Sequence, residues 1–233
     1  MSAATTTRPA RTRRERVVGA TAIALAASLV VQNAIVVAVD SPAYSDPIKD
    51  VLAFHADHRL AVAIVVGLEA LNLPLLLGFL SGLHGLARRR RGAGADWSRL
   101  ALAAGATLSA VLALYAAMWD GVVLSAGRLA GPSPELELVW QLHGAAFALA
   151  LPALGTTFIG AAFAAHANGL TWSWQRLLAI GGGGLLIIAG AFNLPIADGS
   201  AVLFVGLPGY FAWIVWLAVT GARLVRTRVA APS

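Results

Sequence analysis

Six long apolar stretches alternate with short polar segments along the chain. A helix that crosses the hydrocarbon core of a bilayer needs about 20 mainly apolar residues, and each stretch meets that length. The predicted spans are residues 17–39, 60–86, 100–125, 138–165, 177–196 and 201–222. The pattern therefore predicts an all-α integral membrane bundle of six transmembrane helices over residues 17–222, with basic tails at 1–16 and 223–233.

The longest polar segment separates the first two spans. Asp46 and Pro47 are typical of a helix start, because aspartate caps a helix N-terminus and proline fits the first turn. We expect a short amphipathic helix here, on the outer surface, with helical spacing at Ile48, Val51, Leu52 and His55. It either runs into the second span or bends toward it. If that helix continues into the second span without a break, one face carries a polar stripe formed by His55, His58, Glu69 and Asn72.

Composition agrees with the membrane class. Hydrophobic residues make up 58% of the chain and charged residues 12%, against about 45–50% and roughly 25% in soluble domains. The chain has no cysteine, which excludes disulfides and thiolate metal ligands. The net charge of +6 does not indicate nucleic-acid binding, because the cations flank apolar runs, where they determine topology.

The distribution of basic residues predicts the orientation. Of the 17 Lys and Arg residues, 3 (Lys49, Arg59 and Arg128) fall in one set of connecting segments, and the other 14 fall in the tails and the remaining segments. Basic residues favour the cytoplasmic side of a membrane. We therefore predict that both termini are cytoplasmic and that the protein lies in the cell membrane.

Polar side chains within the spans gather in the half nearer the predicted outside. They are Gln32, Asn33, Glu69, Asn72, Asp120, Gln141, His143 and Asn193. An ionisable group at a helix centre costs about 2.5–3.5 kcal/mol on insertion scales, so such groups need partners or water. Glu69 is the deepest carboxylate, about 13 Å below the outer boundary.

These positions predict an outward-facing polar cavity that binds or transports a small polar ligand, an ion or a lipid headgroup. Glu69 would be its central acceptor, and the other expected ligand-binding residues are Asn72, Asp120, His143 and Asn33. The simpler alternative is that these side chains only hydrogen-bond the helices to one another.

Histidine and aspartate residues of the chain could also serve two other chemistries, zinc binding and haem binding. A zinc site would use His55, His58, His143 and Asp120, and its bound water would make the protein a metal-dependent membrane hydrolase. No His-Glu-x-x-His motif supports it. Two haems could also be bracketed by His58 and His84 of the second span together with His143 and His166 of the fourth. The two histidines lie about 39 Å apart along the second span and about 35 Å apart along the fourth, which places the two haems near opposite faces and far apart for electron transfer. We expect neither cofactor and do not favour an enzyme.

A third alternative is a structural or regulatory membrane subunit. Its predicted cytoplasmic arginine clusters would contact anionic lipid or a partner protein.

Three features carry a family resemblance. They are the Asp46-Pro47 segment leading to His58-Arg59, the arginine-rich loop at 88–91, and the stretch at 213–226. Together they resemble a group of actinobacterial multi-pass membrane proteins of unknown function. Frequent alanine and arginine with a single lysine also suit a high-GC genome. The resemblance implies a six-helix topology and supplies no catalytic residues.

Overall fold

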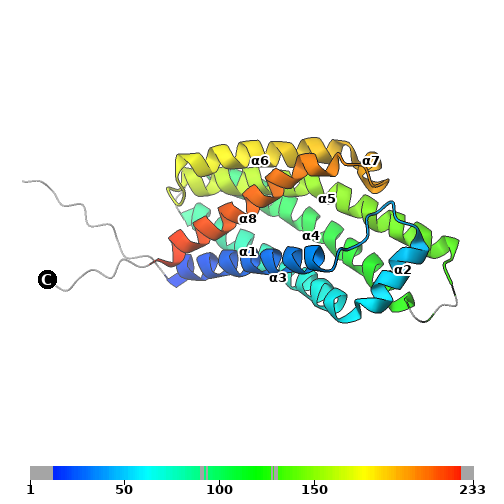
Figure 1. Cartoon of the computed structure of the whole chain (residues 1–233). Coiled ribbons are helices and arrows are strands. Elements are labelled where there is room, and N and C mark those ends of the chain that lie inside the picture. Colours follow the sequence, from blue (N-terminus) through cyan, green and yellow to red (C-terminus); the bar gives the residue numbers. More distant parts are fainter. Residues whose placement is uncertain (1–12, 90–91, 93, 127, 129–130, 227–233) are drawn as a thin grey trace, which may run out of the picture.

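The computed structural model describes residues 13–89, 92, 94–126, 128 and 131–226, and this part of the chain contains helices and connecting segments but no strand (Figure 1). Six helices are long and apolar enough to cross a membrane: α1 (Arg13–Ala38), α3 (Arg59–Arg89), α4 (Gly94–Ser125), α5 (Pro134–Ala167), α6 (Ser173–Ala191) and α8 (Leu203–Val225). Two short helices, α2 (Ile48–Asp57) and α7 (Asn193–Ala197), lie between them. The predicted all-α membrane class and the short helix after the first span are confirmed.

The long helices form a closed ring in which sequence neighbours alternate in direction (Figure 1). The helix α1 packs on α3, α3 on α4, α4 on α5, α5 on α6, α6 on α8, and α8 returns to α1. The helix α5 is the most buried of the six and also contacts α3 and α8. The ring therefore surrounds a shared interior to which most of the helices contribute side chains.

Glycines allow the helices to approach closely at their crossings. A Cβ on Gly19 of α1 would lie 2.8 Å from the carbonyl oxygen of Gly221 in α8, and a Cβ on Gly221 would lie 2.7 Å from that of Gly19. Small residues at such crossings are typical of membrane helices, because close packing drives their association in lipid.

The predicted fifth span ends earlier than expected. Residues 177–196 were predicted to be one helix, but α6 ends at Ala191 and Phe192 separates it from α7. Pro195 explains the break, because proline has no N–H for the bond to residue 191 and its ring clashes with that carbonyl. As a result Asn193 is exposed rather than held inside the bundle.

The short helix α2 does not continue into α3. His58 forms the C-cap of α2 with φ −108° and ψ 28°, and its side chain is exposed. The apolar face of α2, with Val51 at its centre, folds back onto a cluster that includes Val62 and Trp119. The unbroken helix on which the predicted polar stripe depended is therefore not formed, because packing of this face bends the chain at His58 and leaves that side chain exposed.

The two ends of the bundle differ in charge. One end, here called the α2 end, carries Lys49, Arg59 and Arg128. The opposite end, here called the basic end, carries Arg13, Arg14, Arg16, Arg88, Arg89, Arg99, Arg176, Arg223 and Arg226. Residues 1–12 and 227–233 of the predicted tails lie outside the described residues. The orientation in a membrane stays a prediction. It requires that basic residues gather at one end of the bundle, as they do here.

Candidate functional site

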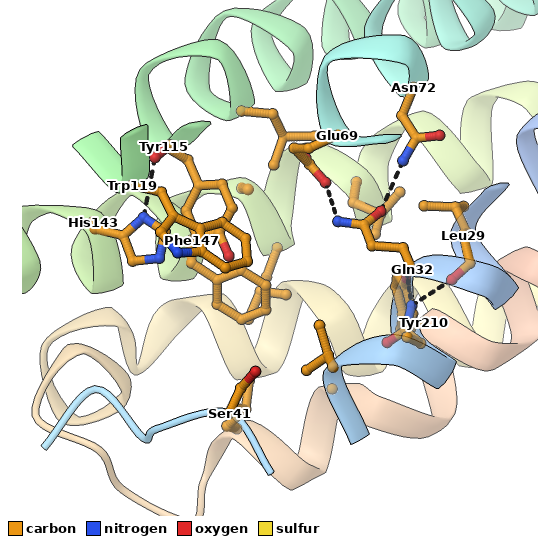
Figure 2. Close-up of a pocket in the computed structure, with 18 of the residues that line it drawn as sticks. Leu29, Gln32, Ser41, Glu69, Asn72, Tyr115, Trp119, His143, Phe147 and Tyr210 are labelled. Atoms are coloured by element: carbon orange, nitrogen blue, oxygen red, sulfur yellow. Dashed lines mark hydrogen bonds between the residues drawn. The ribbon is translucent and has the colours of Figure 1, made fainter. Parts of the chain in front are cut away.

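A cavity of about 360 Å³ lies in the half of the bundle nearer the α2 end (Figure 2). Small-molecule sites in proteins typically measure about 300–1,000 Å³. Helices α1, α3, α4, α5 and α8 form its wall, and α2 and the segment at 41–44 also contribute to its lining. The cavity is thus formed by five of the six long helices, all except α6, rather than by one helix pair.

A chain of hydrogen bonds runs along one wall of this cavity. The Gln32 amide nitrogen of α1 donates to a Glu69 carboxylate oxygen of α3 at 2.5 Å. The Asn72 amide nitrogen donates in turn to the Gln32 carbonyl oxygen at 2.9 Å, as Figure 2 shows. The remaining amide oxygen of Asn72 is buried without a protein partner. Glu69 is therefore oriented by a neutral amide.

The charge of the cavity lining is unbalanced. Glu69 is its only carboxylate, and no lysine or arginine is among the described residues that line it. The Glu69 side chain is only 6% exposed. A buried carboxylate is costly unless it is paired with a cation or takes up a proton. Glu69 is thus a buried carboxylate with no cationic lysine or arginine beside it in the described lining.

Aromatic side chains form the opposite wall. The His143 ring stacks on Tyr115 at 3.9 Å between ring centroids and on Trp140 at 4.9 Å. Its Nδ1 donates to the backbone carbonyl of Tyr115 at 3.0 Å. Because a carbonyl oxygen only accepts, this contact places a proton on Nδ1. Further aromatic residues in the lining are Tyr44, Phe54, Trp119, Phe147, Phe204, Tyr210 and Trp213.

His55 connects α2 to this wall. The Trp119 indole N–H donates to His55 Nε2 at 2.8 Å, and His55 Nδ1 donates to the Val51 carbonyl at 2.6 Å. Burial lowers the pKa of His55, and the backbone bond to Val51 opposes that change. His55 therefore links α2 to Trp119 of α4, and both of its ring nitrogens are hydrogen-bonded.

Tyr44, in the segment between α1 and α2, covers the cavity from the α2 end. Its ring lies 5.7 Å from those of His143 and Phe147. Gly144 makes room for it, because a Cβ there would lie 3.0 Å from Tyr44 Cγ. Burial raises the pKa of Tyr44 far above its usual value, a hydrogen bond from Tyr115 opposes this, and the charge of Glu69 raises it further. The Tyr44 hydroxyl thus shares the electrostatic environment of Glu69.

A second polar contact joins α1 to α8. The Asn33 amide nitrogen donates to the Tyr210 hydroxyl at 2.7 Å and to the Leu29 carbonyl at 2.7 Å. Both Asn33 and Tyr210 line the cavity.

Four of the five residues predicted to bind a ligand meet at this cavity: Glu69, Asn72, His143 and Asn33. Asp120 does not, since its side chain is exposed and lies outside the lining. Successive helix residues are rotated by about 100°. Because Trp119 faces the interior, Asp120 faces outward.

Sequence reasoning left Gln32 and the tyrosines out of the predicted site. Gln32 stood out as a polar residue within a span, and it holds Glu69. Tyr115 and Trp119 are one helical turn apart on α4, a spacing that places them on one face. Tyr44 carried no signal, because it belongs to a polar connecting segment.

The proposed zinc ligands do not come together. His58 is exposed and stacks on Phe54, Asp120 is exposed, and both ring nitrogens of His55 are occupied. Within the described part of the chain, no group of three or more His, Cys, Asp or Glu residues is arranged to hold a metal ion. For haem, His84 lies at the basic end with its Nδ1 2.9 Å from Ser98 Oγ, at the far end of α3 from His58.

Comparison of the chain with protein-family models, curated proteins and solved structures finds no match in any of the three. The chain is a multi-pass integral membrane protein. Its assignment to an actinobacterial family and to the bacterial cytoplasmic membrane stays a prediction.

Proposed function

We propose that the protein binds a small polar ligand in this cavity and transports it across a bacterial cytoplasmic membrane. The supporting observation is the hydrogen-bonded array of Glu69, Gln32 and Asn72 on the wall of a cavity of small-molecule size. An ionisable residue inside a membrane is costly and usually marks a functional pathway. Glu69 is the central acceptor of the site.

The charge asymmetry of the bundle supports an outward-facing cavity. The cavity lies toward the α2 end, and most of the described arginines lie at the opposite end. Since basic residues favour the cytoplasm, the α2 end faces outward. A ligand then enters from the outside, past Tyr44.

Two features favour transport over static binding. Trp213 forms part of the cavity lining and stacks on Trp216 at 5.5 Å, so a buried aromatic pair separates the cavity from the basic end. Pro74, Pro152 and Pro208 also lie within α3, α5 and α8, next to residues that line the cavity. Each proline removes a backbone hydrogen bond and allows its helix to bend there.

Cysteine accessibility tests this proposal, because the chain has no native cysteine. Leu112 of α4 lines the cavity, and Leu114 on the same helix is 58% exposed on the outer surface of the bundle. Leu112→Cys and Leu114→Cys are treated in intact cells with membrane-impermeant methanethiosulfonates, one cationic and one anionic. We expect at least one reagent to modify Leu112→Cys from outside and neither to modify Leu114→Cys, which faces lipid.

Two outcomes would contradict this proposal. If neither reagent reaches Leu112→Cys from outside while both modify it in inside-out vesicles, the outward-facing cavity is ruled out. If it is unreactive from both sides in folded protein, there is no accessible cavity.

A further inference from the structure

We propose that the ligand is an organic cation, an ammonium group on an apolar body, with Glu69 as its counter-charge and the aromatic wall as its second contact. This inference rests on the proposed function, since it names the ligand class of the same cavity. It follows from charge, wall composition and size taken together.

The charge of the lining indicates a cationic ligand. Among the described residues of the lining, Glu69 is the single carboxylate, and its hydrogen-bond donor is the neutral amide of Gln32. The two histidines of the lining, His55 and His143, each donate Nδ1–H to a backbone carbonyl and are held among aromatic rings. No basic side chain of the described lining faces Glu69, so a cationic ligand supplies the missing positive charge.

The aromatic side chains of the lining indicate the same class of ligand. Tyr115 and Phe147, with ring centroids 5.9 Å apart, form one side of the cavity, and Glu69 and Gln32 form the other (Figure 2). Tyr44 closes the aromatic side at 5.7 Å from Phe147. Aromatic faces attract ammonium groups within about 6 Å, and the attraction grows when water is excluded. A carboxylate facing aromatic rings is thus complementary to an ammonium ion.

Other ligand classes fit poorly. An anion would meet Glu69 without any lysine or arginine in the described lining to hold it. A bare metal ion needs several oxygen or nitrogen ligands around one point, and the described residues offer no such group. A sugar needs many polar partners, whereas leucines make up much of the remaining lining. A cavity of about 360 Å³ also leaves room for an apolar body beside the charged group.

Two matched probe series test the class. The first is choline, its neutral carbon isostere 3,3-dimethylbutan-1-ol, and the anion 3,3-dimethylbutanoate. The second is 2-phenylethylamine, 2-phenylethanol and phenylacetate. Binding of each to purified full-length protein in detergent is measured by calorimetry or equilibrium dialysis. We expect at least one cation to bind at least tenfold more tightly than its neutral isostere, with no binding of either anion.

Variants at two positions locate the cation in the site. Glu69→Gln should abolish this preference while the protein stays folded, as judged by gel filtration and melting temperature. Tyr115→Leu should weaken cation binding at least fivefold, whereas Tyr115→Phe, which keeps the aromatic face, should stay within about twofold. The Tyr115 pair keeps the test decisive if Glu69→Gln fails to fold.

The outcomes separate the two proposals. Cation binding that depends on Glu69 supports the inference. Equal binding of cations and neutral isosteres overturns the ligand class and leaves a binding cavity in place. If no cation binds, the inference fails, and the proposed function is then judged separately by the accessibility of Leu112→Cys.

Discussion

Gln32 of α1 donates its amide N–H to the Glu69 carboxylate of α3, across 37 residues of sequence. The same amide accepts from Asn72, so a neutral side chain on one helix orients two polar side chains on another. This pairing ties the first membrane helix to the residue on which the proposed function depends.

The coupling of Gln32 and Glu69 is measurable as stability. Gln32→Leu should lower the free energy of unfolding by about 1–3 kcal/mol, because Glu69 would lose its donor and stay buried. The double variant Gln32→Leu/Glu69→Leu should cost less than the sum of the single variants by at least about 0.5 kcal/mol. Gln141→Leu, at an exposed position on α5, is the matched control. Strict additivity in denaturant titrations would show that the two side chains do not interact.

The packing of Tyr44 on Gly144 predicts a second effect. Gly144→Ala gains helix propensity but forces its Cβ against the Tyr44 ring. Gly121→Ala gains the same propensity with nothing within 4 Å of its Cβ. We expect Gly144→Ala to be less stable than Gly121→Ala by about 1–3 kcal/mol, measured as unfolding free energy. The difference should shrink in a Tyr44→Leu background, and if it persists there, Tyr44 is not its cause.

His55 predicts a pH dependence. Burial lowers the pKa of folded His55 below its usual 6.5, so the unfolded chain binds the proton more readily. The stabilisation is complete above pH 6.5 and is lost as the pH falls through 6.5, with a slope of at most about 1.4 kcal/mol per pH unit. His55→Gln should flatten the loss of melting temperature between pH 7.5 and 5. Parallel curves for the two proteins would refute the assignment.

Asp120 and Glu69 should behave differently although both are carboxylates within a span. Asp120 is exposed and outside the cavity, so Asp120→Asn should leave cation affinity within about twofold of the parent. Glu69→Gln should remove it. Comparison of the two variants in the same dialysis assay checks this, and a comparable loss in Asp120→Asn would place the ligand elsewhere.

The sequence predicted six apolar helices of membrane-spanning length because length and apolarity are properties of each segment alone. It also predicted Glu69, Asn72, His143 and Asn33 as interior, because lipid is a costly environment for them. It could not separate Asp120 from Trp119, since membrane helices are apolar on both their lipid and interior faces and give little face-specific pattern.

Several features of the site depend on tertiary contacts that a single segment does not specify. The bend at His58 arises because α2 packs back on Val62 and Trp119, which lie on other helices. Tyr44 reaches the cavity only because Gly144, 100 positions later, leaves space for its ring. Gln32 becomes part of the site only through its partner on α3. None of these relations is visible in a single segment.

The most direct test of the account compares how fast two reagents modify Leu112→Cys. The cationic 2-(trimethylammonium)ethyl and the anionic 2-sulfonatoethyl methanethiosulfonates are applied to protein with Glu69 or with Glu69→Gln, and each rate is divided by that of a free thiol in solution. Attraction by a carboxylate in a low-dielectric cavity should make the cation-to-anion rate ratio at least tenfold higher with Glu69 than with Glu69→Gln. An unchanged ratio would contradict a cavity in which Glu69 attracts cations.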